Sequence, residues 1–364
     1  MPRAESVPEL RLRSYHEVSG ALFRKEAEWE VPAGYGPLDS EVNAVRRTVG
    51  SIDFSDRAKV AVRGSDRVTF LDGLVTADVK TLRPGMSAYA LVLDEVSHVL
   101  GDLRVSALDD IFVMDIEAAQ KDFLLEYLRK QVVSDEVVFE DRGFCGHIEV
   151  HGPRAPDAVS AVVGVDVRGL SVGEHTTFPL NRHRTGYVSR VNTFGEAGYA
   201  VWALGDDLDV AWESLVRTGV TPVGRDAFDV LRIEAGRPRF GLDMTEENLA
   251  LEVAPEGSID FSKGCYKGQE VVARGASIGR VGRRLFGLRV DGDVPPSRGD
   301  AVRVEGEDAG FVTSGCWSPT TGWIVALSLL RVDKVRTDSQ FFIDHAGWDL
   351  RASWHPLPFV LGRA

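Results

Sequence analysis

The sequence predicts an α+β protein with more than one domain, on three observations. Up to residue 284, segments with apolar residues at helical spacing alternate with short strand-like runs. From residue 285 onward the helical pattern stops, and short β-rich runs are separated by Gly, Asp and Pro turns. The length of 364 residues, with 44% apolar composition, is sufficient for two or three packed domains.

The first elements follow from residue spacing. Residues 39–49 carry three valines at helical spacing and end at Gly50, and a strand at 59–63 follows. Helices on an antiparallel sheet would make the block 58–135 one α+β domain. Strands are predicted in it at 88–93, 99–107 and 111–116, before a helix that begins near Ala118.

The remaining chain continues both patterns and then becomes purely β. Strands are expected around Ile148, Val188 and Val201, and helices at 156–163, 207–218 and 225–234. Beyond residue 285, the runs 286–290, 301–304, 323–330 and 340–343 predict a small closed or sandwich-like β domain.

Composition and charge exclude several classes of partner. The formal net charge of −13 disfavours indiscriminate binding to nucleic acid or anionic lipid, which needs a surplus of Lys and Arg. The N-terminal residues lack an apolar leader segment, and no apolar run is long enough to span a membrane. We therefore expect a cytoplasmic protein that binds neither nucleic acid nor membrane.

The three cysteines do not predict a metal site. Cys145, Cys265 and Cys316 lie far apart and show no Cys-x-x-Cys or Cys/His ligand spacing. Cys145 and Cys316 have apolar or aromatic neighbours and are expected to be buried thiols in a reducing compartment. Cys265 stands in a different setting.

Residues 263–270 form the most informative stretch of the chain. They read Lys263, Gly264, Cys265, Tyr266, Lys267, Gly268, Gln269 and Glu270. Because glycine permits φ > 0 and close backbone approach, the two glycines predict a shaped turn rather than a continuous helix. Such a turn would present Cys265, Tyr266 and Gln269, as in a functional site.

This octapeptide lies in an ordered frame of further motifs. The frame comprises Val-Gly-Ser-Ile-Asp-Phe-Ser at 49–55, Gly-Asp-Leu at 101–103, Arg-Ile-Glu-Ala-Gly-Arg-Pro-Arg-Phe-Gly at 232–241 and Thr-Ser-Gly at 313–315. The combination resembles the YgfZ branch of the glycine-cleavage T-protein (aminomethyltransferase) superfamily, nearly end to end. These proteins bind tetrahydrofolate, and some are tied to the maintenance of iron-sulfur enzymes.

The resemblance implies a three-domain T-protein-like fold. Two mixed α/β domains would surround a central folate cavity, and a β-barrel-like domain would follow. The implied division is residues 1–57 with 136–250 as a discontinuous domain, 58–135 as the second domain, 251–284 as a linker segment with the octapeptide, and 285–364 as the β domain.

Asp102 and Tyr89 are the first candidate site residues. Strand alternation would turn Leu100, Asp102 and Arg104 to one face. The resemblance implies that Asp102 faces the reactive nitrogens of tetrahydrofolate and assists proton transfer, and that Tyr89 lines the folate site. The alternatives are a surface or turn aspartate and a tyrosine packed in the core.

Two departures from the T-protein pattern concern the pterin ring of the folate. Ala200 stands where T-proteins place a glutamate that grips the pterin, and Phe228 stands where they place an arginine. A pterin presents adjacent N–H donors that suit a carboxylate. Glu196 is a candidate substitute for the missing acid.

Cys265 is a candidate reactive group. Its neighbours Lys263 and Lys267 would lower the pKa of the thiol by favouring the thiolate. It is either a redox-sensitive or group-accepting thiol near the folate pocket, or part of a structural turn. The basic run 263–284 would meet an anionic ligand or an acidic partner, or it is a solvated edge. Histidines such as His147 and His151 are scattered, and none is assigned to catalysis.

Three functions follow as alternatives. The first is a tetrahydrofolate-binding, YgfZ-like protein that supports iron-sulfur enzymes, with Asp102 at the folate and Cys265 nearby. The second is a tetrahydrofolate-dependent aminomethyltransferase acting with a lipoyl carrier protein. The third is a non-catalytic module that docks a protein partner through the basic run.

Overall fold

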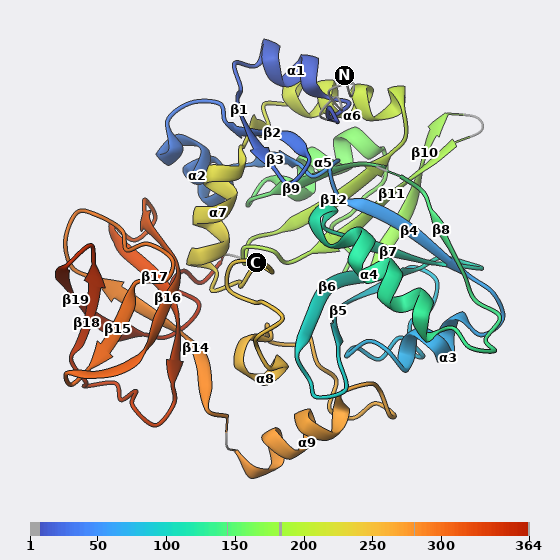
Figure 1. The fold of residues 1–364 in the computed structure, drawn as a ribbon. Coiled ribbons are helices and arrows are strands. Elements are labelled where there is room, and N and C mark those ends of the chain that lie inside the picture. The colour runs from blue at the N-terminus through green and yellow to red at the C-terminus, as the bar shows by residue number, and fades with distance from the viewer. Residues whose placement is uncertain (1–7, 144, 182–183, 280, 363–364) are drawn as a thin grey trace, which may run out of the picture.

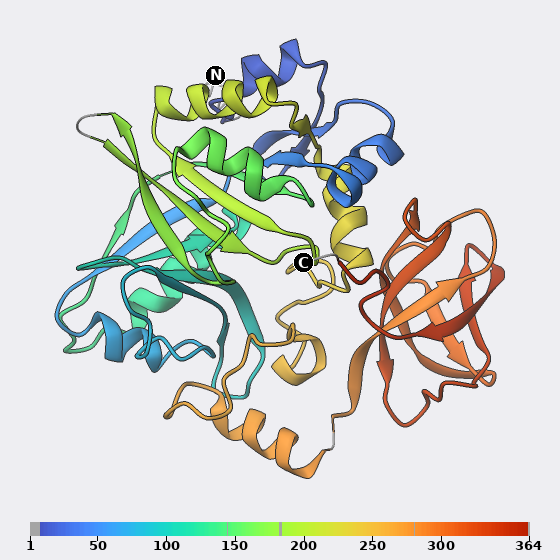
Figure 2. The same ribbon diagram turned by 180° about the vertical axis from the view of Figure 1, so that it is seen from behind.

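The computed structural model describes residues 8–143, 145–181, 184–279 and 281–362 of the chain. Two sheets with their helices lie together, and a closed barrel stands to one side of them (Figures 1 and 2). The predicted fold, two mixed α/β domains followed by a β-barrel domain, is confirmed. No helix within the described ranges has both the length and the apolar character needed to cross a membrane.

The first sheet has six strands and helices on one face. Alternation on its central strands turns Ile148, Val150 and Val201 toward these helices, where they pack with Val159 and Trp212. In spatial order the strands are β10 (His175–Asn181), β11 (Arg184–Val191), β12 (Gly198–Ala203), β9 (Gly146–His151), β3 (Gly50–Asp53) and β13 (Thr221–Pro222). The covering helices are α5 (Ala155–Val163) and α6 (Asp206–Arg217).

The second sheet has five strands and is covered by α4 (Ala118–Gln131) and α3 (Arg67–Asp72). Leu103 packs there against Leu124 and Leu128 of α4. In spatial order the strands are β5 (Met86–Leu93), β6 (Val99–Ala107), β7 (Phe112–Ile116), β4 (Ala58–Arg63) and β8 (Val138–Asp141).

The last strand of this sheet corrects a predicted boundary. β8 pairs with β4, so residues 138–141 join the sheet of the 58–135 segment rather than the other domain. Apolar alternation reveals that a strand exists, but the choice of its neighbour is a long-range pairing that alternation does not encode.

The N-terminal segment and α7 connect the sheets to the barrel. α7 (Arg225–Glu234) packs against α2 (Leu38–Arg47) and β2 (Trp29–Gly34) on one side and against the barrel on the other. The remaining N-terminal elements are α1 (Arg13–Val18) and β1 (Leu22–Glu26). Two short helices, α8 (Ala250–Val253) and α9 (Gln269–Ile278), lie between α7 and the barrel in sequence.

The C-terminal domain is a closed barrel of six strands around an apolar core that includes Leu288, Val312 and Phe341. In spatial order they are β14 (Arg283–Val290), β17 (Trp323–Arg331), β16 (Glu307–Ser318), β15 (Ala301–Val304), β18 (Phe341–His345) and β19 (Trp348–His355). Sequence spacing did not reveal β16 and β19, because several of their residues are polar or glycine.

Candidate functional site

The two sheets face each other with polar inner faces. On the five-stranded sheet, Arg104 lies opposite Tyr89 of β5 and Asp115 of β7. On the six-stranded sheet, Glu149 lies opposite Ala200. Each pair points away from the covering helices, because its neighbours along the strand fill the apolar layers. We call these two facing surfaces together the inter-sheet site.

Contacts between the faces close one end of this site. The Lys59 Nζ lies 3.4 Å from His147 Nδ1 and 5.1 Å from the centroid of the Trp202 ring. It also donates to Asp115 Oδ1 at 2.9 Å. Burial opposes ionisation of Asp115, but the charges of Arg57 and Lys59 outweigh it and hold the pKa of that carboxyl well below its usual range.

Asp102 is held on the inner face by two side chains. Gln120 Nε2 donates to Asp102 Oδ1 at 3.0 Å, and the Asp102 N–H donates back to Gln120 Oε1 at 3.0 Å. The Tyr89 hydroxyl donates to Oδ2 at 2.9 Å. Gly101 allows this approach, since a Cβ there would lie 2.5 Å from Gln120 Oε1. The two residues predicted to line the folate site are thus in direct contact.

Burial, with the nearby Asp102 carboxylate, raises the pKa of Tyr89 well above its ordinary value. The hydroxyl therefore stays protonated and acts as a donor at any physiological pH. Tyr89 and Asp102 are both only partly buried, so a ligand can reach them.

Sequence reasoning missed a cluster of three alternate residues on β9. Glu149 Oε2 contacts His151 Nε2 at 2.8 Å and accepts from Thr193 Oγ1 at 3.1 Å, while His147 Nε2 lies 3.5 Å from Oε1. Burial opposes ionisation of Glu149, but the two histidines hold its pKa well below the usual range. The sequence did contain a signal for this cluster. The polar residues His147, Glu149 and His151 alternate with the apolar residues Ile148 and Val150, which is the pattern of a strand with one polar face. No metal-binding group of three acids, histidines or cysteines occurs among the described residues.

Arg104 faces this cluster from the other sheet. Burial lowers the pKa of Arg104, although the carboxylates of Glu149 and Asp115 oppose that effect. Within the described ranges, its guanidinium has neither a hydrogen bond nor an ion pair. The inter-sheet site therefore contains one arginine available to a ligand.

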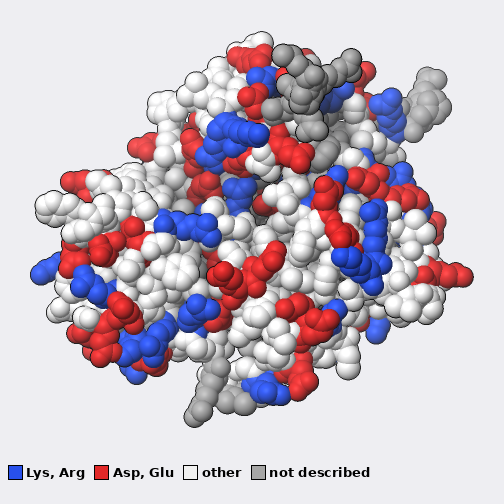
Figure 3. All heavy atoms as spheres, viewed as in Figure 1, with Lys and Arg blue, Asp and Glu red and all other residues white. Residues whose placement is uncertain are grey.

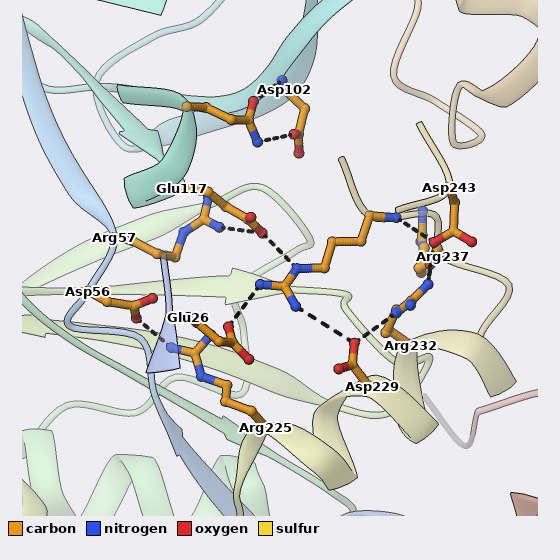
Figure 4. Close-up of polar contacts among 12 residues, drawn as sticks. Glu26, Asp56, Arg57, Asp102, Glu117, Arg225, Asp229, Arg232, Arg237 and Asp243 are labelled. Atoms are coloured by element: carbon orange, nitrogen blue, oxygen red, sulfur yellow. Dashed lines mark hydrogen bonds and ion pairs between the residues drawn. The ribbon is translucent and has the colours of Figure 1, made fainter. Parts of the chain in front are cut away.

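A cavity of about 380 Å³ lies next to Arg57 and Glu117 and is lined by charged residues of both signs. Arg239 contacts three acids of this cavity, Glu26 at 3.0 Å, Glu117 at 3.6 Å and Asp229 at 3.8 Å. Figure 4 shows these three acids with Arg57 and Arg225 nearby. Arg57 reaches Glu117 at 3.5 Å. Four arginines and four acids line the cavity, namely Arg24, Arg57, Arg225, Arg239, Glu26, Asp56, Glu117 and Asp229.

Glu117 differs from the other acids of this cavity. Burial raises its pKa, and the neighbouring Asp102 and Asp56 add to that effect against the opposing charges of Arg239 and Arg57. The carboxyl group of Asp102 thus lies close enough to Glu117 to influence it, and Glu117 holds a proton more readily than usual.

The two departures from the T-protein pattern lie in apolar surroundings. Ala200 is buried with Val113 and Trp202. Phe228 packs edge-on against Phe54 and Phe194, with ring centroids 5.3 Å and 5.7 Å apart. Neither position offers a charge to a ligand.

Glu196, the candidate substitute acid, is buried and paired with Arg46. The Arg46 Nη1 donates to its two oxygens at 2.7 Å and 2.6 Å, and the same guanidinium binds Glu234 Oε2 at 2.7 Å. Ser318 of the barrel donates to Glu234 at 2.6 Å. Glu196 is thus part of a network of ion pairs and hydrogen bonds that joins α2, α7 and the barrel. A role of Glu196 in binding a ligand stays a prediction.

The octapeptide forms a turn that leads into a helix, as the glycines predicted. Gly268 has φ +82°, and a Cβ there would lie 2.6 Å from the Asp94 carbonyl oxygen. Tyr266 is buried, Cys265 is exposed, and α9 starts at Gln269. Gly264 and Glu270 are exposed.

Lys263 anchors this turn to the five-stranded domain. Its ammonium donates to the carbonyl oxygens of Asp72, Val75 and Ala77 at 2.7–2.9 Å and lies 3.0 Å from the Asp72 carboxylate. The Lys267 ammonium binds Glu95 at 2.7 Å. Both cations predicted to activate Cys265 are therefore engaged elsewhere.

Two further cations of the basic run are also paired, whereas Arg284 has no ion pair among the described residues. Arg274 binds Glu270 at 2.8 Å and Arg283 binds Glu252 at 3.1 Å. Charges of both signs are interspersed over the face seen in Figure 3. Arg280 lies outside the described residues. This arrangement weakens the basis for a basic docking surface.

Comparison with known proteins agrees with this architecture. The GCVT N-terminal domain family matches residues 12–263, and the glycine cleavage T-protein C-terminal barrel domain matches residues 283–360. The chain is 28% identical to an aminomethyltransferase of Geobacillus kaustophilus, covering 96% of this chain and 97% of the relative. It is 30% identical to one of Geobacillus thermodenitrificans, covering 93% and 94% respectively.

A solved structure supports the same assignment. The glycine cleavage system aminomethyltransferase T from Bartonella henselae superposes with a TM-score of 0.89 at 25% identity, covering 98% of this chain and 99% of that one. The chain belongs to the glycine cleavage T-protein family.

Proposed function

We propose that this protein binds tetrahydrofolate or a one-carbon derivative in the inter-sheet site and transfers a one-carbon group of the aminomethyl type. The observation that carries the proposal is the placement of Asp102. Its carboxylate is fixed by Gln120 and Tyr89 on an accessible inner face, where a general base must be held. Relatives that cover nearly the whole chain are named aminomethyltransferases.

The residues present fit a folate. The inner faces offer an aromatic face in Tyr89, a carboxylate in Glu149 and a donor in Arg104, and the described structure leaves the buried Trp202 Nε1 without a partner. These groups suit a flat ring that carries both donors and acceptors. When bound, tetrahydrofolate supplies the nitrogen that carries the one-carbon unit.

Asp102 would accept a hydrogen bond from that N–H and take up its proton. Tyr89 and Gln120 hold the carboxylate in one orientation, which lowers the entropy cost of reaching the reactive geometry. Glu117, whose pKa is raised by burial and by the charge of Asp102, is a second carboxyl group near the site that can hold a proton.

Calorimetric titration of the reduced protein with tetrahydrofolate tests the binding step. We expect saturable binding, weakened about 10-fold or more in Asp102→Asn because a charge-assisted hydrogen bond is lost. Asp157→Asn, on the exposed surface of α5, is the matched control and should bind normally. Absence of binding by the unmodified protein would refute the proposal.

The transfer step needs its own assay. The protein is incubated with tetrahydrofolate and an aminomethylated lipoyl carrier protein, and methylene-tetrahydrofolate is measured. Product formation that is lost in Asp102→Asn supports the transferase. Folate binding without product would leave a folate-dependent role of another kind.

A YgfZ-like role in maintaining iron-sulfur enzymes is the second candidate, and the exposure of Cys265 favours it. The thiol lies on a turn anchored by Lys263, which suits contact with a protein partner such as an iron-sulfur enzyme. In this role Cys265→Ala would keep the fold and folate binding but lose complementation of a strain deficient in the maintenance function. Normal complementation by this variant would contradict the role.

A further inference from the structure

Glu149 and Ala200 are direct cross-strand partners on β9 and β12. In an antiparallel pair, residues directly opposite each other point to the same face, with Cβ atoms about 4.5–5.5 Å apart. Both residues therefore face the five-stranded sheet. Because Ala200 contributes only a methyl group, the Glu149 side chain is the polar group of this pair.

The Glu149 carboxylate has unused accepting capacity. Oε2 is engaged by Thr193 and His151, whereas Oε1 has only the 3.5 Å contact with His147 among the described residues. That distance is too long for a good hydrogen bond. The Glu149 side chain is 13% exposed, so a small ligand can reach it.

The surroundings of Glu149 contain further polar atoms without partners. The Trp202 Nε1 and His151 Nδ1 are buried, and no described residue bonds to either atom. Arg104, on the facing sheet, feels the charge of Glu149 without pairing directly with it. Unpaired buried polar atoms are rare in native proteins, and several in one place indicate a site for a polar ligand or ordered water.

The charges restrict the chemistry of that ligand. A simple anion would be repelled by Glu149, and a simple cation by Arg104. A flat neutral ring with N–H donors beside a carbonyl acceptor satisfies both residues at once. The 2-amino-4-oxopyrimidine half of a pterin has this edge.

We propose that Glu149 and Arg104 together recognise the 2-amino-4-oxopyrimidine edge of the folate. Glu149 accepts the ring N–H and the 2-amino group, and Arg104 donates to the carbonyl oxygen. The Thr193 hydroxyl can rotate away from Oε2 to free the second acceptor. This inference rests on the proposed function and assigns recognition of the pterin to β9 and β6, since β12 has only Ala200 at the facing position.

The first test compares affinities by calorimetry with tetrahydrofolate. Glu149→Gln keeps the size of the side chain but removes its charge, and it should weaken binding about 10- to 100-fold. The control Glu140→Gln lies on β8 in a pair with Arg63 at the edge of the other sheet, and it should bind like the unmodified protein. Thermal unfolding of each variant confirms that it is folded.

A second ligand separates recognition from a structural role. In the 2-desamino-2-methyl analogue of tetrahydrofolate, the amino group that Glu149 would bind is replaced by a methyl group. The unmodified protein should prefer tetrahydrofolate over this analogue by about 10-fold or more, because a site built to bond an N–H rejects a ligand that lacks it. Glu149→Gln should lose most of this preference, and loss of stability alone would not change a ratio of two affinities.

Moving the acid across the strand pair provides the positive test. The double variant Glu149→Ala, Ala200→Glu returns a carboxylate to the same face about one strand spacing away, and it should recover part of the affinity and of the preference. If the unmodified protein binds tetrahydrofolate and Glu149→Gln leaves affinity and preference unchanged, this inference is overturned while the proposed function stands. If the unmodified protein binds no tetrahydrofolate, both fail together.

Discussion

The Tyr89 hydroxyl and the Asp102 carboxylate are joined by a hydrogen bond of 2.9 Å across β5 and β6. Gln120 of α4 holds the other carboxylate oxygen, so Asp102 is fixed from both sides. A hydrogen bond to a charged acceptor contributes about 1.5–3 kcal/mol. The arrangement positions one carboxylate toward the inter-sheet site at the expense of its freedom to rotate.

Removing the hydroxyl should reduce folate affinity without abolishing it. In Tyr89→Phe, Asp102 keeps its bonds to Gln120 but can rotate away from the productive orientation. We expect affinity for tetrahydrofolate to fall about 3- to 10-fold, less than in Asp102→Asn. Tyr127→Phe, which removes a hydroxyl bonded to the Leu93 carbonyl oxygen outside the site, is the control in the same titration.

Adding one methyl group next to Asp102 should disturb both stability and the site. In Gly101→Ala the new Cβ would lie 2.5 Å from Gln120 Oε1 and 2.9 Å from a Leu124 methyl group. Overpacking of this kind destabilises by about 1–3 kcal/mol, which urea unfolding would measure. Gly169→Ala has open space around it and should change stability little. Equal effects of the two substitutions would contradict this account of Gly101.

Lys263 should be important for folding rather than for chemistry. Lys263→Met removes the donor for three carbonyl oxygens and leaves Asp72 with the exposed Lys80 as its cation partner. Loss of one partner from a buried pair typically costs about 3–5 kcal/mol. Lys267→Met breaks a pair with Glu95, which is 75% exposed, so its loss should stay within about 1 kcal/mol. Urea unfolding of the two variants distinguishes these outcomes.

Glu26 should make stability depend on acid pH. Burial alone would raise its pKa, but the charges of Arg225 and Arg239 and the hydrogen bond from Arg24 lower the pKa to about 2, from 4.5. Because the pKa of Glu26 is lower in the folded than in the unfolded protein, its ionised form stabilises the folded state at pH values above 4.5. This contribution is lost as the pH falls from 4.5 toward 2.

Glu26→Gln should therefore lower the free energy of unfolding by about 2–3 kcal/mol at pH 7, and the difference from the unmodified protein should shrink below pH 4. Chemical unfolding across the pH range measures this difference. Glu30→Gln, which loses a more exposed pair with Arg13, is the control and should show a smaller effect. A difference that persists unchanged at pH 2.5 would contradict the role of ionised Glu26.

One thiol should react much faster than the others in the native protein. Cys265 is exposed, whereas burial raises the pKa of Cys145 and raises that of Cys316 to about 12. Titration with a thiol reagent should show one fast-reacting group, and Cys265→Ser should remove that phase. A fast phase that survives this substitution would show that another cysteine is accessible.

Local patterns predicted the elements and part of the site. Alternation correctly placed Asp102 and Arg104 on one face of a strand, because side-chain direction in a strand has a period of two residues. It was wrong for Leu100, which lies at a shift in the pairing of β5 with β6 and packs in the apolar core beside α4. The glycines of the octapeptide correctly predicted a turn, because Gly268 adopts a positive φ. Such information lies within a few residues of the chain.

The tertiary structure decided which of these residues meet. Lys263 binds carbonyl oxygens 186–191 residues away, and Arg46 binds Glu196 at a separation of 150 residues. Glu149 came to face Ala200 through the register of β9 against β12, and a shift of one residue would have turned it into the apolar layer. The sequence by itself determined most of the helices, strands and turns, and the alternation of side chains along each strand. The choice of strand neighbours and register, which the energy of the whole packed core selects, assembled the inter-sheet site.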